Sequence, residues 1–203
     1  MTETASQHET TRVQLIRSAR RLFAAHGYAG ASIAAISQEL GLTKQALLHH
    51  FGSKDRLYAL AVEQTAREIL QILFDAMEEG RPPEDQLEAF FAALLSHLDE
   101  DATPVQLLTR ELMDQALKPQ DQAGSSLDDV MQSLVATVQA TEKWQDTGVQ
   151  AALALVVQLL GAATLNFTAK GTLQRVFGRT TCQGAGGQFS EIFADVVSRT
   201  LRE

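Results

Sequence analysis

Apolar residues recur along most of this chain at the spacing of one face of an α-helix. The clearest stripe lies between residues 87 and 98, where large apolar side chains stand at i, i+3, i+4, i+7, i+8 and i+11. Gly, Pro, Ser and Thr separate this stripe from similar ones before and after it. The pattern therefore predicts an all-α protein. Together with the motif in residues 32–51 described below, it predicts an N-terminal three-helix helix-turn-helix domain joined to a C-terminal helical domain.

The stripes and their flanking cap residues predict nine helices and three non-helical segments. The helices are expected over about 11–27, 32–41, 43–51, 53–79, 82–98, 103–117, 126–138, 147–169 and 189–201. A disordered polar tail is expected over 1–9, a polar linker over 119–125 and a glycine-rich loop over 178–187. The expected domains are residues 10–56 and 57–203.

Residues 32–51 contain two short helical patterns joined by a glycine turn. Ser32 and Thr43 stand where each helix needs an N-cap, and Gly41 supplies the turn. Two helices joined in this way form a helix-turn-helix, which places its second helix in the major groove of DNA. The alternative is an ordinary helical hairpin with exposed polar residues.

The second of these helices has two distinct faces. Leu47 and Phe51 share the apolar face at i, i+4, which is expected to pack on the preceding helices. The other face presents polar side chains that can bond base edges and phosphates. Adjacent His49 and His50 diverge around the helix, so they cannot chelate one metal ion. The predicted DNA-contacting residues are Ser32, Thr43, Lys44, Gln45, Leu48, His49, His50 and Lys54.

Charge is distributed unevenly along the chain. The net charge is −8, which by itself argues against a nucleic-acid partner. Residues 1–60, however, carry a net charge of +3, and the remaining residues carry −11. Because the attraction of basic side chains to phosphate is a local electrostatic effect, a basic N-terminal segment followed by an acidic remainder is compatible with DNA binding by the N-terminal segment.

Residues 12–60 resemble the N-terminal domain of the TetR family of transcriptional repressors. The resemblance implies a homodimer with one helix-turn-helix per subunit, and it implies that Ser32 binds phosphate. The chain departs from the family in having Leu48 and His49 where aromatic residues are usual, and Gln45 where glycine is common. The matching residues are Ala19, Leu22, Phe23, Gly27, Tyr28, Ser32, Ile36, Gly41, Leu42, Lys44, Leu47, His50, Phe51, Ser53, Lys54 and Leu57.

The same resemblance implies that residues 57–203 sense a small molecule and form the dimer. Few polar groups stand at the expected pocket positions, so an apolar or amphipathic effector is expected. Arg110 and Glu111, which stand inside an otherwise apolar helix, are expected to form surface or interhelical ion pairs. The alternative for Arg110 is that it orients an anionic effector. The predicted effector-binding residues are Phe74, Phe90, Phe91, Leu94, Leu108, Arg110, Met113, Trp144, Asn166 and Phe167.

The helix predicted over 147–169 is apolar nearly all round, and a partner subunit would cover the side that the protomer leaves open. The alternative is a central core helix in a monomer. The predicted dimer interface combines this helix with the last one. It contains Ala152, Leu155, Val156, Leu159, Ala163, Phe189, Ile192, Phe193 and Val196.

Other function classes find little support in the sequence. The cluster His97-Leu98-Asp99-Glu100-Asp101 is typical of a solvated helix end, and no phosphate loop, nucleophile motif or metal-ligand set is present. We therefore expect no enzymatic activity, cofactor or metal. The single cysteine, the polar N-terminus and an apolar run of only 151–165 favour a cytoplasmic protein without a membrane span. The remaining alternative is an effector-independent DNA-binding or partner-binding regulator that has no small-molecule pocket.

Overall fold

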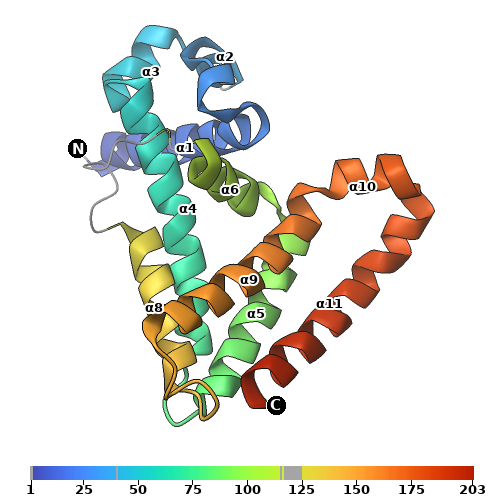
Figure 1. The fold of residues 1–203 in the computed structure, drawn as a ribbon. Coiled ribbons are helices and arrows are strands. Elements are labelled where there is room, and N and C mark those ends of the chain that lie inside the picture. Colours follow the sequence, from blue (N-terminus) through green and yellow to red (C-terminus); the bar gives the residue numbers. More distant parts are fainter. Residues whose placement is uncertain (1, 40, 115, 117–124) are drawn as a thin grey trace. The chain divides into compact units, whose positions relative to one another are not determined.

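The computed structural model describes residues 2–39, 41–114, 116 and 125–203, with side chains described from residue 12 onward. These residues form ten helices and no strand, which confirms the predicted all-α class (Figure 1). The chain divides into two compact units. One comprises Met1–Ala66 and Gln106–Ala123, and the other comprises Arg67–Val105 and Gly124–Glu203. Two helices, α4 (Lys54–Ala76) and α6 (Thr103–Asp114), each contribute residues to both units.

The first unit is built from α1 (Thr2–Gly30), α2 (Ile33–Glu39), α3 (Lys44–Phe51), the first part of α4 and most of α6. Helix α2 packs against both α1 and α3. Large apolar side chains with 0–2% of their surface exposed fill the centre of this unit. They are Leu15, Phe23, Ile36, Leu47, Phe51, Leu57, Tyr58 and Leu107.

The second unit is a helical bundle. It contains α5 (Pro83–Glu100), α8 (Ser126–Ala140), α9 (Val149–Thr168), α10 (Lys170–Phe177), α11 (Arg179–Arg202) and the remainder of α4. Helix α5 packs against α8, α9 and α11, and α8 packs against α9 (Figure 1). The predicted stripe on α5 is confirmed as the buried face of this helix, because all six of its large apolar residues are at most 5% exposed.

The helix starts follow the predicted caps closely. Ser32, Thr43 and Ser53 each accept a hydrogen bond from the backbone N–H three residues later, at 3.0–3.1 Å. In α8 the cap is Ser125 rather than the predicted Ser126, and it forms a reciprocal capping box with Asp128. The predicted linker over 119–125 lies outside the described residues except for Ser125.

The first helix differs from the prediction at both ends. It starts at Thr2 instead of near Thr11, because the segment before Thr11 contains no Pro or Gly to stop it. The segment predicted as a polar tail is thus helical from Thr2 onward. The helix extends to Gly30, but Gly27 interrupts it with φ 71° and ψ 174°. The predicted stop at Gly27 therefore appears as a kink inside α1.

One further boundary differs from the prediction. Helix α4 ends at Ala76 rather than Glu79, because the prediction extended the helix past its last hydrogen-bonded turn, where helix ends fray. Helix α6 is described as far as Asp114, and its predicted end at Leu117 lies outside the described residues.

The predicted loop over 178–187 is wrong. Only Gly178 leaves helical geometry, at φ 86°. The segment before it, for which no element was predicted, is the short helix α10, and α11 begins directly after it at Arg179. An interior glycine costs a helix about 0.5–1 kcal/mol relative to alanine, but it does not forbid one. The far half of α11 is anchored by buried Phe193, Val197 and Leu201, so the helix extends back through its glycines.

Helix α9 is long and apolar enough, by length and composition, to cross a membrane, and it is longer than the predicted apolar run of 151–165. A single such helix is a weak indication, because a helix packed against other protein surfaces passes the same test. Its most apolar window is one-third buried in the protomer, which leaves one side of the helix open.

Candidate nucleic-acid interface and a groove in the second unit

Helix α3 presents one polar face to solvent. Leu47 and Phe51 are fully buried in the first unit, as predicted. Lys44, Gln45 and His49 on the opposite side are exposed, together with the cap residue Thr43. Leu48 and His50 are half-buried at the edges of this face. An exposed polar strip on a short helix held from behind is the arrangement that reads base edges in a major groove.

The turn between α2 and α3 fixes the angle at which α3 is presented. Gly41 has φ 67°, and the N–H of Leu42 donates to the carbonyl of Ser37 at 2.8 Å. A Cβ at Gly41 would meet no atom within 4 Å. Glycine is therefore required there by the backbone conformation and not by lack of space.

Lys54 is held beside an aromatic cluster that connects α1 with α4. Its ammonium lies 4.4 Å from the ring centroid of Tyr28, whose hydroxyl donates a hydrogen bond to Asp55. That hydrogen bond to a carboxylate is the main reason why the pKa of Tyr28 is raised to about 12. Tyr58 packs edge-on against Tyr28 and Phe23, at centroid distances of 5.1 and 4.8 Å.

Arg110 caps the interrupted helix α1. The kink at Gly27 leaves carbonyl oxygens without intrahelical partners, as at any helix end. Arg110 Nε donates to Ala24 at 2.7 Å, and Nη2 donates to Ala25 at 3.0 Å. The structure thus places Arg110 at the end of α1 rather than in a cavity, so an effector role receives no support from its position.

The neighbouring residue on α6, Glu111, is buried against α4. Glu111 and Tyr58 are 2% and 1% exposed, and burial, followed by this carboxylate, raises the pKa of Tyr58. The sequence predicted surface or interhelical ion pairs for both Glu111 and Arg110. In the structure Arg110 donates to backbone carbonyls of α1 and Glu111 interacts with Tyr58 of α4, because adjacent helical residues point in different directions.

The remaining predicted effector residues are scattered. Phe74 and Met113 are exposed, Phe90 and Leu94 are buried core residues, and Leu108 belongs to the first unit. Three others do border hollows in the second unit: Phe91, Asn166 and Phe167.

Trp144 borders neither of these hollows, and its indole N–H donates to the carbonyl of Thr200 at 3.0 Å. The predicted pocket thus gathered residues by their apolar character, and only tertiary packing separated core residues from cavity walls.

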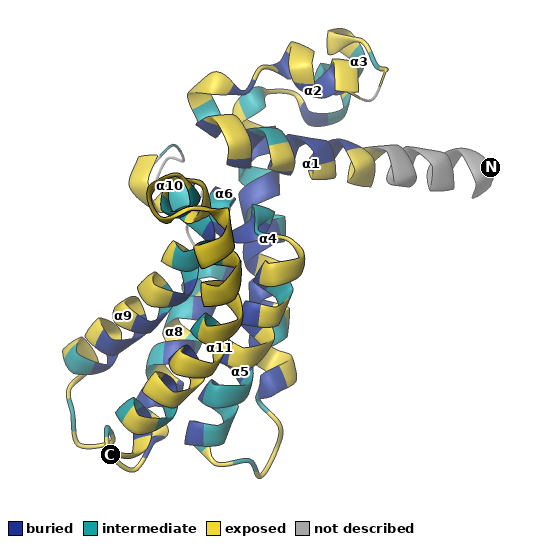
Figure 2. Ribbon diagram, turned by 90° about the vertical axis from the view of Figure 1, so that its right-hand side faces the viewer, coloured by how far each residue is buried: buried dark blue, intermediate teal, exposed yellow. Residues whose placement is uncertain are grey.

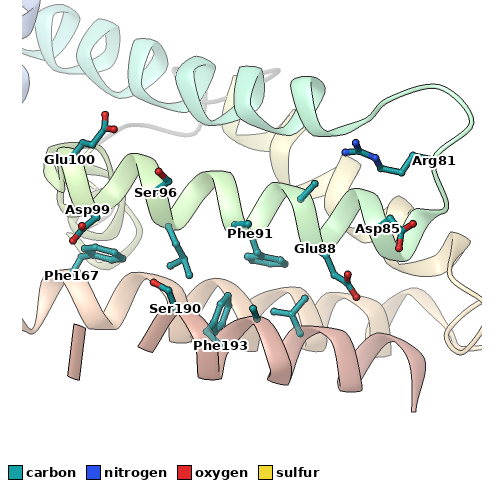
Figure 3. Close-up of a pocket in the computed structure, with 15 residues that line it drawn as sticks. Arg81, Asp85, Glu88, Phe91, Ser96, Asp99, Glu100, Phe167, Ser190 and Phe193 are labelled. Atoms are coloured by element: carbon teal, nitrogen blue, oxygen red, sulfur yellow. The ribbon is translucent and has the colours of Figure 1, made fainter. Parts of the chain in front are cut away.

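A groove of about 780 Å³ lies between α5 and α11, with Phe167 of α9 at one end (Figure 3). Phe91 and Phe193 form its floor, with ring centroids 5.6 Å apart. Asp85 and Glu88, near the start of α5, are bridged by Arg202, and Arg81 pairs with Glu78. The lining residues are Arg81, Asp85, Glu88, Ala89, Phe91, Ala92, Leu95, Ser96, Asp99, Glu100, Phe167, Ser190, Phe193, Ala194 and Val197.

The predicted interface residues fall into two groups. Most pack inside the protomer, and Phe189 is half-buried. Ile192 and Val196 are exposed. The residues that are buried in the protomer's own core are Ala152, Leu155, Val156, Leu159, Ala163 and Phe193.

The exposed side of α9 is a different one from the side predicted. It presents Val149, Leu153, Val157 and Leu165, which repeat every four residues or multiples of four (Figure 2). The sequence did not distinguish the two sides because α9 is apolar on both.

In the described ranges no group of three or more His, Cys, Asp and Glu side chains is arranged to hold a metal ion. Cys182 is a free, half-buried thiol on α11.

Comparison with known proteins matches the first unit to one family. Residues 15–61 match the family of bacterial regulatory proteins described as the tetR family. The chain is 40% identical over 65 residues to the HTH-type transcriptional repressor AcnR of Corynebacterium efficiens, covering 32% of this chain and 35% of that protein. It is 33% identical over 106 residues to the HTH-type transcriptional regulator LmrA of Bacillus subtilis, covering 50% and 56%. These alignments thus span about a third to just over half of the curated relatives' lengths.

Solved structures extend the likeness to the whole fold. A TetR-like transcriptional regulator from Rhodococcus sp. RHA1 superposes with a TM-score of 0.69 at 20% identity, covering 93% of each chain. The TetR family transcriptional regulator PfmR from Thermus thermophilus gives 0.67 at 20% identity, covering 93% and 94%. Proteins of this family are transcription factors and not enzymes. Residues 15–61 of this chain thus match the tetR family of bacterial regulatory proteins, and the chain as a whole has the fold of solved TetR-like transcriptional regulators.

Proposed function

We propose that this protein is a cytoplasmic transcriptional repressor that binds a palindromic operator as a homodimer and is released by a small molecule. The observation that carries the proposal is the exposed polar face of α3 opposite its buried face. Lys44 is suited to a guanine edge or a phosphate, and Gln45 to an adenine edge. The repressor names of the relatives support the direction of control.

Dimerisation would use the exposed sides of α9 and α11. Leu153 and Val157 on α9, and Ile192 and Val196 on α11, are 44–62% exposed. A second copy placed across a two-fold axis would bury these apolar side chains. A palindromic operator requires the two α3 helices of such a dimer to lie about one DNA turn apart, roughly 34–36 Å.

Release would follow from a shift between conformations. An effector that binds better to one arrangement of the second unit shifts the population toward it. Helices α4 and α6 each contribute residues to both units, so a displacement of either helix in the second unit also moves residues of the first unit, which contains α3. On α4 the first-unit end holds Tyr58, and on α6 it holds Arg110, which is bonded to α1.

The test is selection of bound sequences from random double-stranded DNA by the purified full-length protein, with the salt dependence of the selected site. An inverted repeat with half-sites one turn apart is expected, with affinity falling steeply as salt rises. Gln45→Ala should relax the preference at one base pair and cost about 1–3 kcal/mol there. The matched control is Gln132→Ala, at an exposed position on α8. Failure to enrich any repeat would contradict the proposal.

An effector-independent regulator is the second candidate. The observation that favours it is that the hollow between α5 and α11 is an open groove, with Ala92, Ser96 and Ala194 among its exposed walls. A screen of small molecules against the protein–operator complex separates the two candidates. Release by at least one compound supports the repressor with an effector, and retention under all of them supports this second candidate.

A further inference from the structure

We propose that the groove between α5 and α11 binds an amphipathic organic cation. Its positive group would lie at Asp99, at the end of the groove that also carries the charge of Glu100, and its apolar part on Phe91 and Phe193. The inference rests on the proposed function, because it names the chemical class of the small molecule that releases the protein from DNA.

The floor of the groove suits a hydrocarbon or aromatic surface. Phe91 and Phe193 are 2% and 4% exposed, and their rings meet edge to face (Figure 3). Leu95 and Val197 extend this floor along α5 and α11. The volume of about 780 Å³ lies within the range of small-molecule sites, which are mostly apolar with a few placed polar groups.

Charge is unbalanced along the groove. At the end where α5 begins, Asp85 and Glu88 are both paired with Arg202. At the other end, Asp99 and Glu100 are exposed, and neither forms an ion pair with any residue that the structure describes. The carboxylate of Asp99, which lies beside Phe167, is thus available to a ligand, and the nearby charge of Glu100 adds to the preference for a positive group (Figure 3).

The helix itself strengthens this preference. Helix α5 ends at Glu100, so Asp99 and Glu100 occupy its last turn, where the helix dipole is negative. Acidic side chains are unfavourable for the helix at that end. Departures from local preference are expected where a residue serves function rather than folding. The carboxylates and the helix end together repel an anionic ligand.

An aromatic ring completes the cationic end. Phe167 of α9 is 7% exposed and lies beside Asp99 at this end of the groove (Figure 3). A ring face next to a carboxylate is a favourable site for an organic ammonium group, through cation–π attraction and direct charge pairing. The arrangement assigns the two ends of the ligand: the ammonium at Asp99 and the apolar part toward Phe91.

The test compares two probes with the same hydrocarbon chain and opposite charge. Binding of dodecyltrimethylammonium and of dodecanoate to the full-length protein is measured by calorimetry, below the micelle concentration of each. We expect the cation to bind at least about tenfold more tightly, with the preference weakening as salt rises. Equal affinity, tighter binding of dodecanoate, or no binding of either probe would overturn the proposal.

A pair of variants assigns the preference to this groove. The double variant Asp99→Asn/Glu100→Gln should lose the preference for the cation. The double variant Glu79→Gln/Asp146→Asn, which removes the same charge at exposed positions outside the groove, should keep it. Thermal unfolding of each variant checks that it is folded. A preference that survives in the first variant, or that is lost in the second, contradicts the assignment.

The proposed repressor function and the proposed cationic effector can be refuted independently. Operator selection with the wild-type protein needs no probe, so its failure would remove the repressor function while leaving the calorimetric comparison intact. Conversely, a protein that binds its operator but shows no preference for the cation would keep its proposed function and lose this effector class.

Discussion

The guanidinium of Arg110 on α6 lies 2.7 Å from the carbonyl oxygen of Ala24 on α1, measured from Nε. A second bond, from Nη2, reaches the carbonyl of Ala25 at 3.0 Å. These carbonyl oxygens lack partners inside the helix because the backbone leaves helical geometry at Gly27, two residues after Ala25. Arg110, at least 85 positions away in sequence, thus supplies the missing hydrogen bonds at the end of α1, the first helix of the first unit.

Removing this cap should destabilise the protein. In Arg110→Ala two carbonyl oxygens lose a charged donor, and we expect a loss of about 1–3 kcal/mol in the free energy of unfolding, moderated by the partial exposure of the site. Urea unfolding followed by circular dichroism measures the change. Arg179→Ala removes an exposed arginine from α11 and serves as the control, with a change within about 0.5 kcal/mol. Equal losses in both variants would refute the capping role.

The positive φ of Gly41 should make this turn intolerant of other residues. Gly41→Ala is expected to cost about 1–2 kcal/mol, because the left-handed region is unfavourable for a residue with a Cβ. Gly171→Ala, in a helical and open position on α10, is expected to gain about 0.5–1 kcal/mol. Differential scanning calorimetry of the two variants gives the comparison. Melting temperatures that move in the same direction would contradict this account of the turn.

The two tyrosines should resist ionisation in the folded protein. The chain contains only Tyr28 and Tyr58, and the pKa of Tyr28 is raised from 10.0 to about 12. A raised folded-state pKa adds stability that is fully present below the unfolded value and is lost as pH rises from about 10 through 12. Absorbance of tyrosinate should therefore stay low at pH 10.5 and rise together with unfolding at higher pH.

The substitution Asp55→Asn tests whether the hydrogen bond to Asp55 raises the pKa of Tyr28. It removes the carboxylate to which Tyr28 donates, so the pKa of Tyr28 should fall back toward its ordinary value. Asp75→Asn, an equal charge change in the part of α4 that belongs to the second unit, should leave the titration unchanged. A tyrosine titration near pH 10 in the wild-type protein would contradict the assigned hydrogen bond.

The exposed side of α9 should be the dimer interface. Leu153→Glu places charges at a position 44% exposed in the protomer, and we expect it to shift the protein to monomers in sedimentation experiments. Phe177→Glu, on α10 and 62% exposed, should leave the dimer intact. Because a palindromic site needs two heads, Leu153→Glu should also weaken operator binding by more than tenfold. A dimer that survives Leu153→Glu would exclude this side of the helix.

The sequence by itself determined the local architecture. Helix starts at Ser32, Thr43 and Ser53 could be predicted because an N-cap satisfies backbone groups within a few residues of itself. The buried and exposed faces of α3 followed from helical periodicity alone. The family resemblance rested on the same short segment.

Only the tertiary structure decided which residues meet across long sequence separations. Apolar character could not separate core residue Phe90 from groove residue Phe91, since both belong to the same stripe. Nor could it choose the exposed side of α9, because a helix that is apolar all round has no pattern that points outward. Arg110 donates a hydrogen bond to Ala24 because the kink in α1 leaves carbonyl oxygens without partners inside the helix. The kink exists only in the folded chain, so the sequence did not reveal this contact.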